Sequence, residues 1–483
     1  MESQFPVVVI GAGPIGLAAA AHLLERGQAV RVLEAGDCAG AAIKQWGHIK
    51  LFSTWRYNID EASRRLLETP TEHYAGDWQA PNPKRLPTGA ELVSEYLEPL
   101  AAHPQLREAI GYGQRVSSVS RVSAEGGGLD KGRSAARDES LFLVRVETAE
   151  GTTELMARAV IDASGTWETP NPIGRSGLSA LGEETARSEG LITSPLPDPL
   201  GADAQRFAGK RVLVLGAGHS AANTLILLGR LKQQNPETQL LWGLRGQANP
   251  VRLYGGGSAD ELPARGQLGT SLRRQVETGQ VTLLEHVSVR ELHSAESLQV
   301  SLADGRELEV DFVVPATGFR PDLSMLSELR LDLDLAVEAP RELGPLIDPE
   351  FHSCGTVSAH GERVLGHPEK NFYIAGMKSY GRAPTFLLAT GYEQVRSLAA
   401  ALSGDRTAAD QVELDLPETG VCSTDTGNSC EVPAASAAGA SSCSAESAQA
   451  PAQEDSCCSA PVPVSFGIAT GTQHGFAELV ERT

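Results

Sequence analysis

The sequence predicts an α/β fold in which two similar units, each a parallel sheet covered by helices, share one chain, with the second unit inserted into the first. Two stretches predict it, VVVIGAGPIGLAAAAHLLERGQAVRVLEAG and KRVLVLGAGHSAANTLILLGRL, because each combines a buried apolar strand, a glycine turn and an apolar helix. At 483 residues, of which 41% are hydrophobic, the chain is long enough for two ordinary cores.

The first glycine turn has the pattern of a dinucleotide-binding, Rossmann-type unit. Gly11, Gly13 and Gly16 occupy the positions that serve a tight turn, close backbone approach to a pyrophosphate and close packing of the helix. The phosphates would then lie at the helix N-terminus, where free N–H groups favour negative charge. Glu34 ends the following strand, where an acid accepts hydrogen bonds from a ribose 2'-hydroxyl. A dinucleotide site is therefore predicted here.

The second glycine turn repeats the pattern with two changes. Gly216 and Gly218 hold the first two positions, Ser220 lies in the same turn, and the small Ala221 replaces the third glycine. The next strand, TQLLWGLRG, ends at Arg245 instead of an acid. An acid would repel a 2'-phosphate whereas Arg can pair with it, so NADPH is predicted over NADH. The alternative is that Arg245 is an ordinary surface arginine.

Two such turns in one chain predict FAD at the first and NADPH at the second. ARAVIDASGTWETPNPIG and VDFVVPATGFRPD each read as a strand running into a small-residue turn, at Gly165 and Gly318, where the chain leaves and re-enters the first unit. KNFYIAGMKSYGRAPTFLLATG predicts a strand, a turn at Gly376 and a helix from about Pro384. The N-terminus of that helix would stabilise negative charge on the flavin pyrimidine.

These patterns predict four parts of the chain. The ranges are 1–166 with 313–403 for a discontinuous FAD-binding domain, 167–312 for the NADPH-binding domain, 404–462 for a flexible cysteine-containing tail, and 463–483 for a C-terminal segment with enough apolar residues to dock on the body. The tail is rich in Ala, Ser and Pro and poor in aromatic residues, a composition that does not build a core.

The order of GAGPIG, GTWETPNPIG, GAGHSA and ATGFRPD resembles that of the two-dinucleotide flavoproteins, and most of all the flavin-containing, class B type monooxygenases, over about residues 5–403. WGHIKLFSTWRYNID and the cysteine-bearing tail resemble flavoproteins encoded in bacterial arsenic-resistance operons, which are often described as flavin-binding monooxygenases. The resemblance implies an FAD- and NADPH-dependent oxidoreductase acting on a small molecule or a metalloid.

In such proteins the segment after the second strand covers the flavin. Here that segment carries Trp46, Trp55, Arg56, Tyr57 and Asn58. By resemblance, Asn58 approaches the flavin edge. We therefore name Trp55, Arg56 and Asn58 as catalytic candidates and Trp46 as a cofactor contact. The alternative is a helix cap followed by an amphipathic helix, because NIDEASRRLLE also begins with good capping residues.

Two departures from known patterns leave other activities open. An FxGxxxH-type stretch, typical of flavin hydroxylases, is missing, because Phe207 and Gly209 are not followed by a histidine at that spacing. Cys38 has no second cysteine nearby, and no CxxC occurs in the chain, so we expect Cys38 to be a small buried side chain. A reductase of disulfides or thiol-bound metal(loid)s and a non-enzymatic metalloid-binding protein remain alternatives.

Five of the seven cysteines follow residue 420, and Cys457 and Cys458 are adjacent. Adjacent cysteines rarely form a relaxed disulfide with each other, whereas two thiolates can share a soft ion. We predict that the pair captures a thiophilic substrate, plausibly trivalent arsenic, and raises its effective concentration near the flavin. The alternative is that these cysteines have no role.

The net charge argues against two classes of partner, and the N-terminal sequence argues against secretion. A net charge of −20 argues against nucleic acid or an anionic membrane, since phosphate binding needs clustered Lys and Arg. The first apolar run follows an acidic residue and is broken by glycines and a proline, which is unlike a secretion signal. We expect a cytoplasmic protein with free thiols and no membrane segment. The sequence does not predict the oligomeric state.

Overall fold

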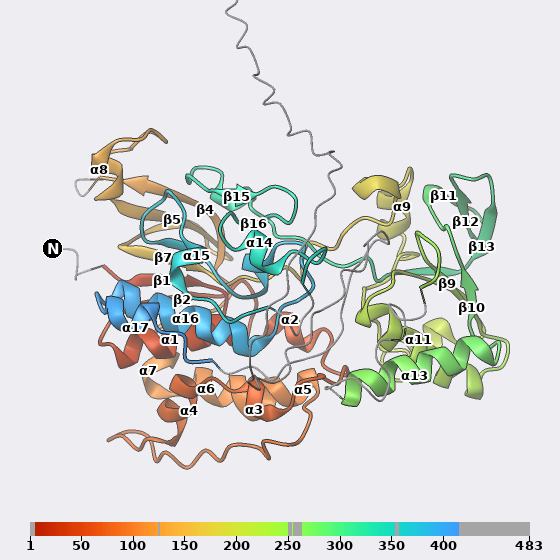
Figure 1. The fold of residues 1–483 in the computed structure, drawn as a ribbon, viewed down its shortest axis with the longest axis horizontal. Helices are drawn as coiled ribbons and strands as arrows, with labels where there is room; N and C mark the ends of the chain where they lie inside the picture. The colour runs from red at the N-terminus through yellow and green to blue at the C-terminus, as the bar shows by residue number, and fades with distance from the viewer. Residues whose placement is uncertain (1–4, 124–125, 250–253, 255–262, 353–356, 415–483) are drawn as a thin grey trace, which may run out of the picture. The chain divides into compact units, whose positions relative to one another are not determined.

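The structure, a computed structural model, describes residues 5–123, 126–249, 254, 263–352 and 357–414 (Figure 1). These residues belong to one unit of the chain, Met1–Asn428. The second unit, Ser429–Thr483, lies outside the described residues, as do Cys457, Cys458 and the predicted docking segment 463–483. The predicted α/β fold with two parallel sheets is confirmed.

The first sheet is assembled from both ends of the described chain, in the order β17-β7-β1-β2-β3 with every pair parallel. Its strands are β1 (Val7–Ile10), β2 (Val30–Leu33), β3 (Ile110–Gly111), β7 (Ala159–Asp162) and β17 (Phe372–Ile374). Between β7 and β17 the chain builds the second sheet, so the segment that carries the second glycine turn is inserted between strands of the first sheet.

Alternate residues of β1 face different layers. Val7 and Val9 pack into a core with α1 and α16, whereas Val8 and Ile10 pack into another core with an antiparallel meander. Figure 1 shows the helices on one side of this sheet and the meander on the other. Because both faces are covered, the strand reads as a continuous apolar run. The covering elements are α1 (Pro14–Glu25), α16 (Leu388–Leu402), β4 (Arg115–Val122), β5 (Leu141–Thr148) and β6 (Gly151–Ala157).

The second sheet repeats this arrangement in the order β10-β9-β8-β14, again parallel throughout. Val212 and Val214 pack with α11, and Leu213 and Leu215 pack toward a second three-stranded meander. The elements are β8 (Arg211–Leu215), α11 (His219–Gln234), β9 (Gln239–Gly243), β10 (Thr282–Leu284), β11 (Val289–Ser294), β12 (Leu298–Leu302), β13 (Glu307–Val310) and β14 (Phe312–Pro315).

The remaining elements are short and connect or cover these layers. The helices are α2 (Ala41–Lys44), α3 (Trp55–Asn58), α4 (Glu61–Glu68), α5 (Gly89–Leu92), the π-helix η2 (Val93–Leu97), α6 (Glu98–Ala102), α7 (Pro104–Arg107), α8 (Ala135–Asp138), α9 (Glu183–Ser188), α10 (Ala204–Phe207), α13 (Pro263–Glu277), α14 (Gly344–Ile347), α15 (Glu362–Leu365) and α17 (Arg406–Asp410). The 3₁₀ turns are η3 (Arg175–Gly177), η5 (Ser324–Leu326) and η6 (Gly376–Tyr380), and β15 (Leu333–Asp334) pairs with β16 (Ala339–Pro340).

Two boundaries differ from the sequence-based expectation. The predicted division between 312 and 313 cuts through β14, which pairs along its whole length with β8 of the second sheet. The last long helix, expected from about Pro384, begins at Leu388. The left-handed Gly381, with φ of 57°, and the extended Leu387 keep the intervening residues out of a helix.

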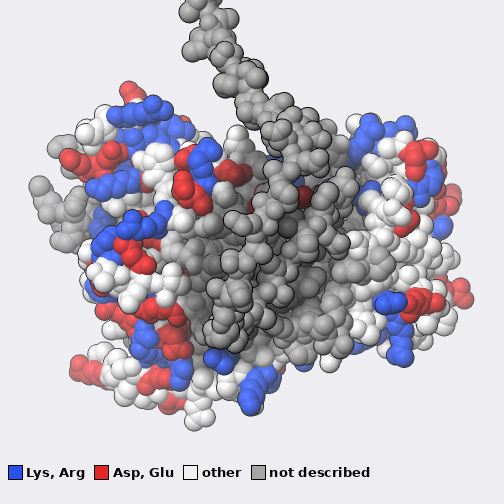
Figure 2. Space-filling view, viewed as in Figure 1, with Lys and Arg blue, Asp and Glu red and all other residues white. Residues whose placement is uncertain are grey.

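The described surface carries both signs of charge. On the face shown in Figure 2, Lys and Arg lie among Asp and Glu, and neither sign forms a continuous patch over the described residues. In the part of the chain that the structure describes, no helix combines the length and the apolar character that crossing a bilayer requires.

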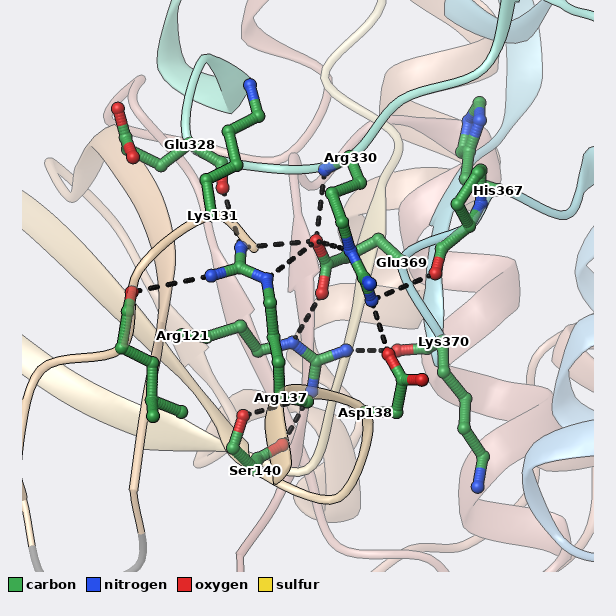
Figure 3. Close-up of polar contacts among 12 residues, drawn as sticks. Arg121, Lys131, Arg137, Asp138, Ser140, Glu328, Arg330, His367, Glu369 and Lys370 are labelled. Carbon is green, nitrogen blue, oxygen red and sulfur yellow. Dashed lines mark hydrogen bonds and ion pairs between the residues drawn. The ribbon is translucent and has the colours of Figure 1, made fainter. Parts of the chain in front are cut away.

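A buried ion cluster fastens the start of β17 to the first meander (Figure 3). The fully buried Glu369 carboxylate accepts from Arg121 Nε at 2.9 Å, from Arg137 Nη2 at 3.2 Å and from the Arg330 backbone N–H at 3.0 Å. Burial alone would raise the pKa of Glu369, but these donors outweigh it and lower that pKa. The cluster joins β4, α8 and two distant loops, so it fixes a strand that enters the sheet from the far end of the chain.

We predict that Glu369→Ala lowers the free energy of unfolding by about 3–5 kcal/mol, because it leaves buried guanidinium groups without a counter-charge. Urea unfolding of purified protein measures this. The matched control is Glu154→Ala, whose partner Arg145 at 2.7 Å is half exposed, so a loss below about 1 kcal/mol is expected. Equal losses in the two variants would show that the cluster does not hold the fold.

Candidate functional site

The three glycines of the first turn have separate roles. Gly11 adopts a left-handed φ of 98°, which favours glycine. A Cβ added to Gly16 would lie 1.9 Å from the Gly11 carbonyl oxygen, so only glycine lets α1 approach β1 this closely. Gly13 is different, because an added Cβ there meets nothing within 4 Å. Its missing side chain therefore leaves open space in front of the α1 N-terminus, as a bound pyrophosphate requires.

Glu34 ties the same turn to the end of β2. Its Oε2 accepts from the Ala12 N–H at 2.6 Å and its Oε1 accepts from the Gly36 N–H at 2.7 Å. Each carboxylate oxygen keeps a further lone pair, so the predicted bond to a ribose hydroxyl stays available. Glu34 directly follows β2, as the sequence predicts, but the sequence did not reveal that the acid also shapes the glycine turn, and its bond to a ribose stays a prediction.

The first turn and its surroundings fit a dinucleotide. Gly165, which follows β7 with φ of 74°, also has open space where a side chain would be. Gly376, with φ of 69°, follows β17 and lies against Ile15 of α1, at 3.0 Å from an added Cβ. The carboxyl ends of β1, β7 and β17 therefore meet at one edge, where ligands bind in open α/β sheets.

The segment expected to cover the flavin contains α2 and α3 and ends at Asp60, the N-cap of α4. Trp55 and Asn58 are buried, whereas Arg56 is exposed. The indole Nε1–H of Trp55 has no acceptor among the described residues. Since buried donors are normally paired, an acceptor on a bound cofactor would satisfy it.

The side chain of Asn58 is held by a neighbour. Its Oδ1 accepts from Ser53 Oγ and its Nδ2 donates to the Ser53 carbonyl, each at 2.8 Å. The Tyr392 hydroxyl of α16 donates to the Asn58 carbonyl at 2.9 Å. The alternative of a helix cap is confirmed, because Asp60 accepts from the Ser63 N–H at 2.8 Å and caps α4. The catalytic role of Asn58 stays a prediction.

Aromatic contacts connect this covering segment to residues around the second glycine turn. The rings of Trp46 and Trp167 lie 6.5 Å apart, and Trp167 lies 5.1 Å from Phe319. Phe52 lies 4.9 Å from His219, which begins α11 in the second glycine turn. The segment that covers the first site therefore also borders the second, which brings the two candidate sites together as hydride transfer requires.

The second glycine turn repeats the geometry of the first. A Cβ on Gly216 would lie 2.0 Å from the Ala316 carbonyl oxygen, whereas one on Gly218 would meet nothing within 4 Å. Ser220 lies in the first turn of α11, and Ala221 is fully buried. Arg245 follows β9 and is exposed, with no hydrogen-bond or ion-pair partner among the described residues.

Among the described residues, Cys38 is the one cysteine. Cys38 is half-buried instead of buried as expected, and burial together with the neighbouring Asp37 raises the pKa of its thiol. No group of three or more His, Cys, Asp or Glu side chains in the described ranges is arranged to hold a metal ion. The predicted ligands Cys457 and Cys458 lie outside them.

We predict that Gly13→Val folds but loses FAD, because its side chain enters open space that the pyrophosphate would occupy. Gly16→Val should instead destabilise the protein, since its Cβ collides with backbone. Flavin absorbance per protein and the melting temperature of the flavin-free form separate the two effects. A Gly13→Val protein with full flavin would contradict the assignment of this turn.

We predict that Arg245→Ala raises the KM for NADPH about 10- to 100-fold and leaves the KM for NADH nearly unchanged, because only NADPH carries the 2'-phosphate. Steady-state kinetics with both cofactors measures this. Arg290→Ala, which removes an exposed arginine of β11, is the matched control. Equal changes for the two cofactors would make Arg245 a surface arginine.

The chain is similar to flavin monooxygenases in sequence and to several flavoproteins in fold. It is 30% identical over 215 residues to the indole-3-pyruvate monooxygenase YUCCA6 of Arabidopsis thaliana, covering 44% of this chain and 42% of that protein. The alignment thus spans less than half of the curated relative. The bacillithiol disulfide reductase of Bacillus cereus is 19% identical with a TM-score of 0.56, covering 83% of this chain and 99% of that chain. The flavin-containing monooxygenase of Stenotrophomonas maltophilia is 21% identical with a TM-score of 0.50, covering 83% and 98%.

The family assignment rests on a match over most of the chain. The family model described as pyridine nucleotide-disulphide oxidoreductase matches residues 5–339, which include both glycine turns. FAD and NAD(P)H are the cofactors of such proteins, and the two turns fit them. The protein is thus a flavin-dependent NAD(P)H oxidoreductase, and the chain belongs to the pyridine nucleotide-disulphide oxidoreductase family.

Proposed function

We propose that the protein is an NADPH-dependent flavin monooxygenase that oxidises a thiophilic small substrate, with trivalent arsenic as the candidate. The observation that carries the monooxygenase assignment is the isolation of Cys38. A dithiol reductase passes electrons through two neighbouring cysteines, whereas Cys38 is the one free cysteine in the described ranges and the chain has no CxxC. The sequence similarity to YUCCA6, a monooxygenase, supports the same choice.

Each of the two parallel sheets belongs to one of the two proposed cofactor-binding domains. The FAD-binding domain takes 1–166 and the chain after β14, and the NADPH-binding domain takes the segment between them. The strand order supports this, because β17 returns to the first sheet after β14 has closed the second. We therefore move the proposed return from 313 to the residues following Pro315.

The chain's own residues would bind and orient the two cofactors. The open space at Gly13 and Gly218 admits the two pyrophosphates, and Arg245 would pair with the 2'-phosphate of NADPH. When bound beside NADPH, FAD would supply the redox chemistry, a hydride acceptor and a source of electrons for dioxygen. The half-buried rings of Trp46 and Trp167 would exclude water from the space between the sites.

The catalytic candidates would act by position and charge. Asn58 is held by Ser53 and Tyr392, so its backbone and amide are fixed in a buried place. Trp55 offers its unpaired indole N–H, and the exposed Arg56 supplies a cation at the rim. A fixed donor and a nearby cation stabilise negative charge that develops during reduction.

The arsenic proposal rests on the cysteines after residue 420. No metal-binding group of His, Cys and carboxylates lies in the described ranges, so thiolate capture of a soft ion would fall to Cys457 and Cys458. The reaction balances as arsenite, dioxygen, NADPH and a proton giving arsenate, NADP⁺ and water. Arsenic and NADPH each lose two electrons, and dioxygen gains four. One oxygen atom goes to arsenic and the other to water.

The second candidate is a reductase of disulfides or thiol-bound metal(loid)s. The adjacent thiols of Cys457 and Cys458 favour it, because they provide the pair that Cys38 lacks. Membership of an enzyme family disfavours the third, non-enzymatic alternative.

Oxygen dependence separates the two enzymatic proposals. We predict that purified protein oxidises NADPH faster when arsenite is added, and that this increment requires dioxygen and yields arsenate. The measurement is NADPH absorbance with and without oxygen, together with arsenic speciation. Full anaerobic turnover with a disulfide or metalloid would favour the reductase, and no response to arsenite under either condition would remove arsenic as the substrate.

We predict that the double variant Cys457→Ala, Cys458→Ala keeps its flavin and its reduction by NADPH but loses arsenite stimulation at low arsenite. One thiol cannot chelate, and the tethered pair no longer concentrates the ion near the site. High arsenite should partly restore the rate. Cys422→Ala is the control, because it removes a tail thiol that has no adjacent partner. Superimposable curves for wild type and double variant would show that the pair has no role.

A further inference from the structure

An exposed aromatic side chain lies at the edge of the first sheet, and the sequence analysis did not single it out. Tyr112 directly follows β3, and 39% of its surface is exposed. Among the Phe, Tyr and Trp residues that the structure describes, Phe351 is the one other exposed ring. A single exposed ring is ordinary by itself, so the surroundings of Tyr112 decide what it can bind.

The strand order lays out the parts of a dinucleotide along this edge. In the order β17-β7-β1-β2-β3, the first glycine turn follows β1, Glu34 follows β2 and Tyr112 follows β3. In a Rossmann-type unit the pyrophosphate lies at the turn after the first strand, and the acid after the second strand binds the ribose of the adenosine half. The flavin half then extends toward β7 and β17. The adenine extends the other way, past Glu34 and toward the residues after β3.

Backbone hydrogen bonds hold the residues after β3 against the residues after β2. The Glu34 N–H donates to the Gly111 carbonyl, and the Gln114 N–H donates to the Glu34 carbonyl, each at 2.8 Å. The Gly113 N–H donates to the Gly36 carbonyl at the same distance. The turn that carries Tyr112 is therefore fixed beside the acid that is predicted to bind the ribose.

The side chain of Tyr112 lies toward this acid and borders an open surface. Partial burial raises the pKa of its hydroxyl, and the nearby charges of Cys38 and Glu34 raise that pKa further. The hydroxyl is thus within electrostatic reach of the Glu34 carboxylate. Gly113, the next residue along the chain, has a left-handed φ of 62°, and an added Cβ there meets nothing within 4 Å. A ligand can therefore reach the exposed ring without displacing protein atoms at Gly113.

We infer that Tyr112 is a binding residue for the adenine of FAD, which stacks on the exposed face of the phenol ring. Every nucleobase has a π face, so an aromatic ring can hold a base without a hydrogen bond to it. This contact makes Tyr112 a specificity residue as well, because it favours FAD over FMN, which has no adenine. The inference rests on FAD at the first glycine turn, and it is independent of the proposed oxygenase chemistry and of the substrate.

A structural role and a ligand-binding role of Tyr112 predict different results. If the ring only packs the turn after β3 against the loop after β2, its removal lowers the melting temperature of the apoprotein and weakens FAD and FMN alike. If the ring stacks on adenine, its removal weakens FAD binding and leaves FMN binding unchanged.

The experiment compares Tyr112→Ala with two controls. Tyr112→Phe keeps the ring and removes the hydroxyl, and Phe351→Ala removes the other exposed ring. For wild type and each variant, flavin fluorescence measures the Kd of FAD and the Kd of FMN for the apoprotein. The melting temperature of each apoprotein reports whether the variant is folded.

We expect Tyr112→Ala to raise the Kd of FAD about 5- to 100-fold, the scale of one base stacked on an aromatic ring. Its Kd for FMN and its apoprotein melting temperature should stay near those of wild type, because the ring is exposed. Both control variants should bind FAD and FMN as wild type does.

Three results would contradict the inference. Tyr112→Ala could bind FAD as tightly as wild type, it could weaken FAD and FMN by the same factor, or wild type could bind FMN as tightly as FAD. Each would show that the ring makes no specific contact with adenine. A wild type that fails to bind FAD would instead remove the cofactor site at the first glycine turn itself.

Discussion

The closeness of α1 to β1 is the constraint on which the rest of the structure depends. A single methyl group at Gly16 would lie 1.9 Å from the Gly11 carbonyl oxygen, so the helix crosses the strand at a distance that no other residue permits. This contact places the helix N-terminus over the end of the strand. In the second sheet the close approach is between neighbouring strand ends, because a Cβ added to Gly216 after β8 would lie 2.0 Å from the carbonyl oxygen of Ala316, which follows β14. Both sheets therefore present an open edge with an anion-binding helix end.

The connections between the two sheets determine how these edges face one another. After β7 of the first sheet the chain passes through Asn171 to the second sheet, and after β14 it passes back through Thr317 and Phe319. Asn171 Nδ2 donates to the Thr317 carbonyl at 3.1 Å, and Thr317 Oγ1 donates to the Asn171 carbonyl at 2.7 Å. The two connections are thus bonded to each other. In addition, the ring of Phe52, in the segment after β2, contacts His219, the first residue of α11. Short-range contacts of this kind can hold the two cofactor sites close together. A movement of one sheet relative to the other would then occur at the two connections.

The sequence could predict those parts of the fold that depend on residues close together along the chain. The strand, turn and helix around Gly11 and around Gly216 lie within about twenty consecutive residues. Their glycines mark positions where the backbone conformation or a close approach excludes a side chain. The cap of α4 by Asp60 was also visible as a local alternative. By contrast, the predicted division between 312 and 313 falls inside β14, because an apolar strand does not reveal which sheet it joins.

The polar interior was not predictable from sequence because its partners lie far apart along the chain. Arg121 and Glu369 are separated by 248 residues, and Lys378 meets Ser164 across 214. The residues around Lys378 in the sequence do not indicate a buried cation, because a lysine in a short turn is typical of the surface. Trp55 was singled out for its type, but its unpaired N–H became visible only with its burial.

The central claim is that two separate sites in one chain, FAD at the first turn and NADPH at the second, work together. Gly218→Val tests it most directly, since its side chain enters open space at the second turn and leaves the first untouched. The measurement is anaerobic reduction of the bound flavin, followed by its absorbance. The account predicts that the variant retains FAD and is reduced normally by dithionite but not by NADPH. Reduction by NADPH at the wild-type rate and affinity would contradict it.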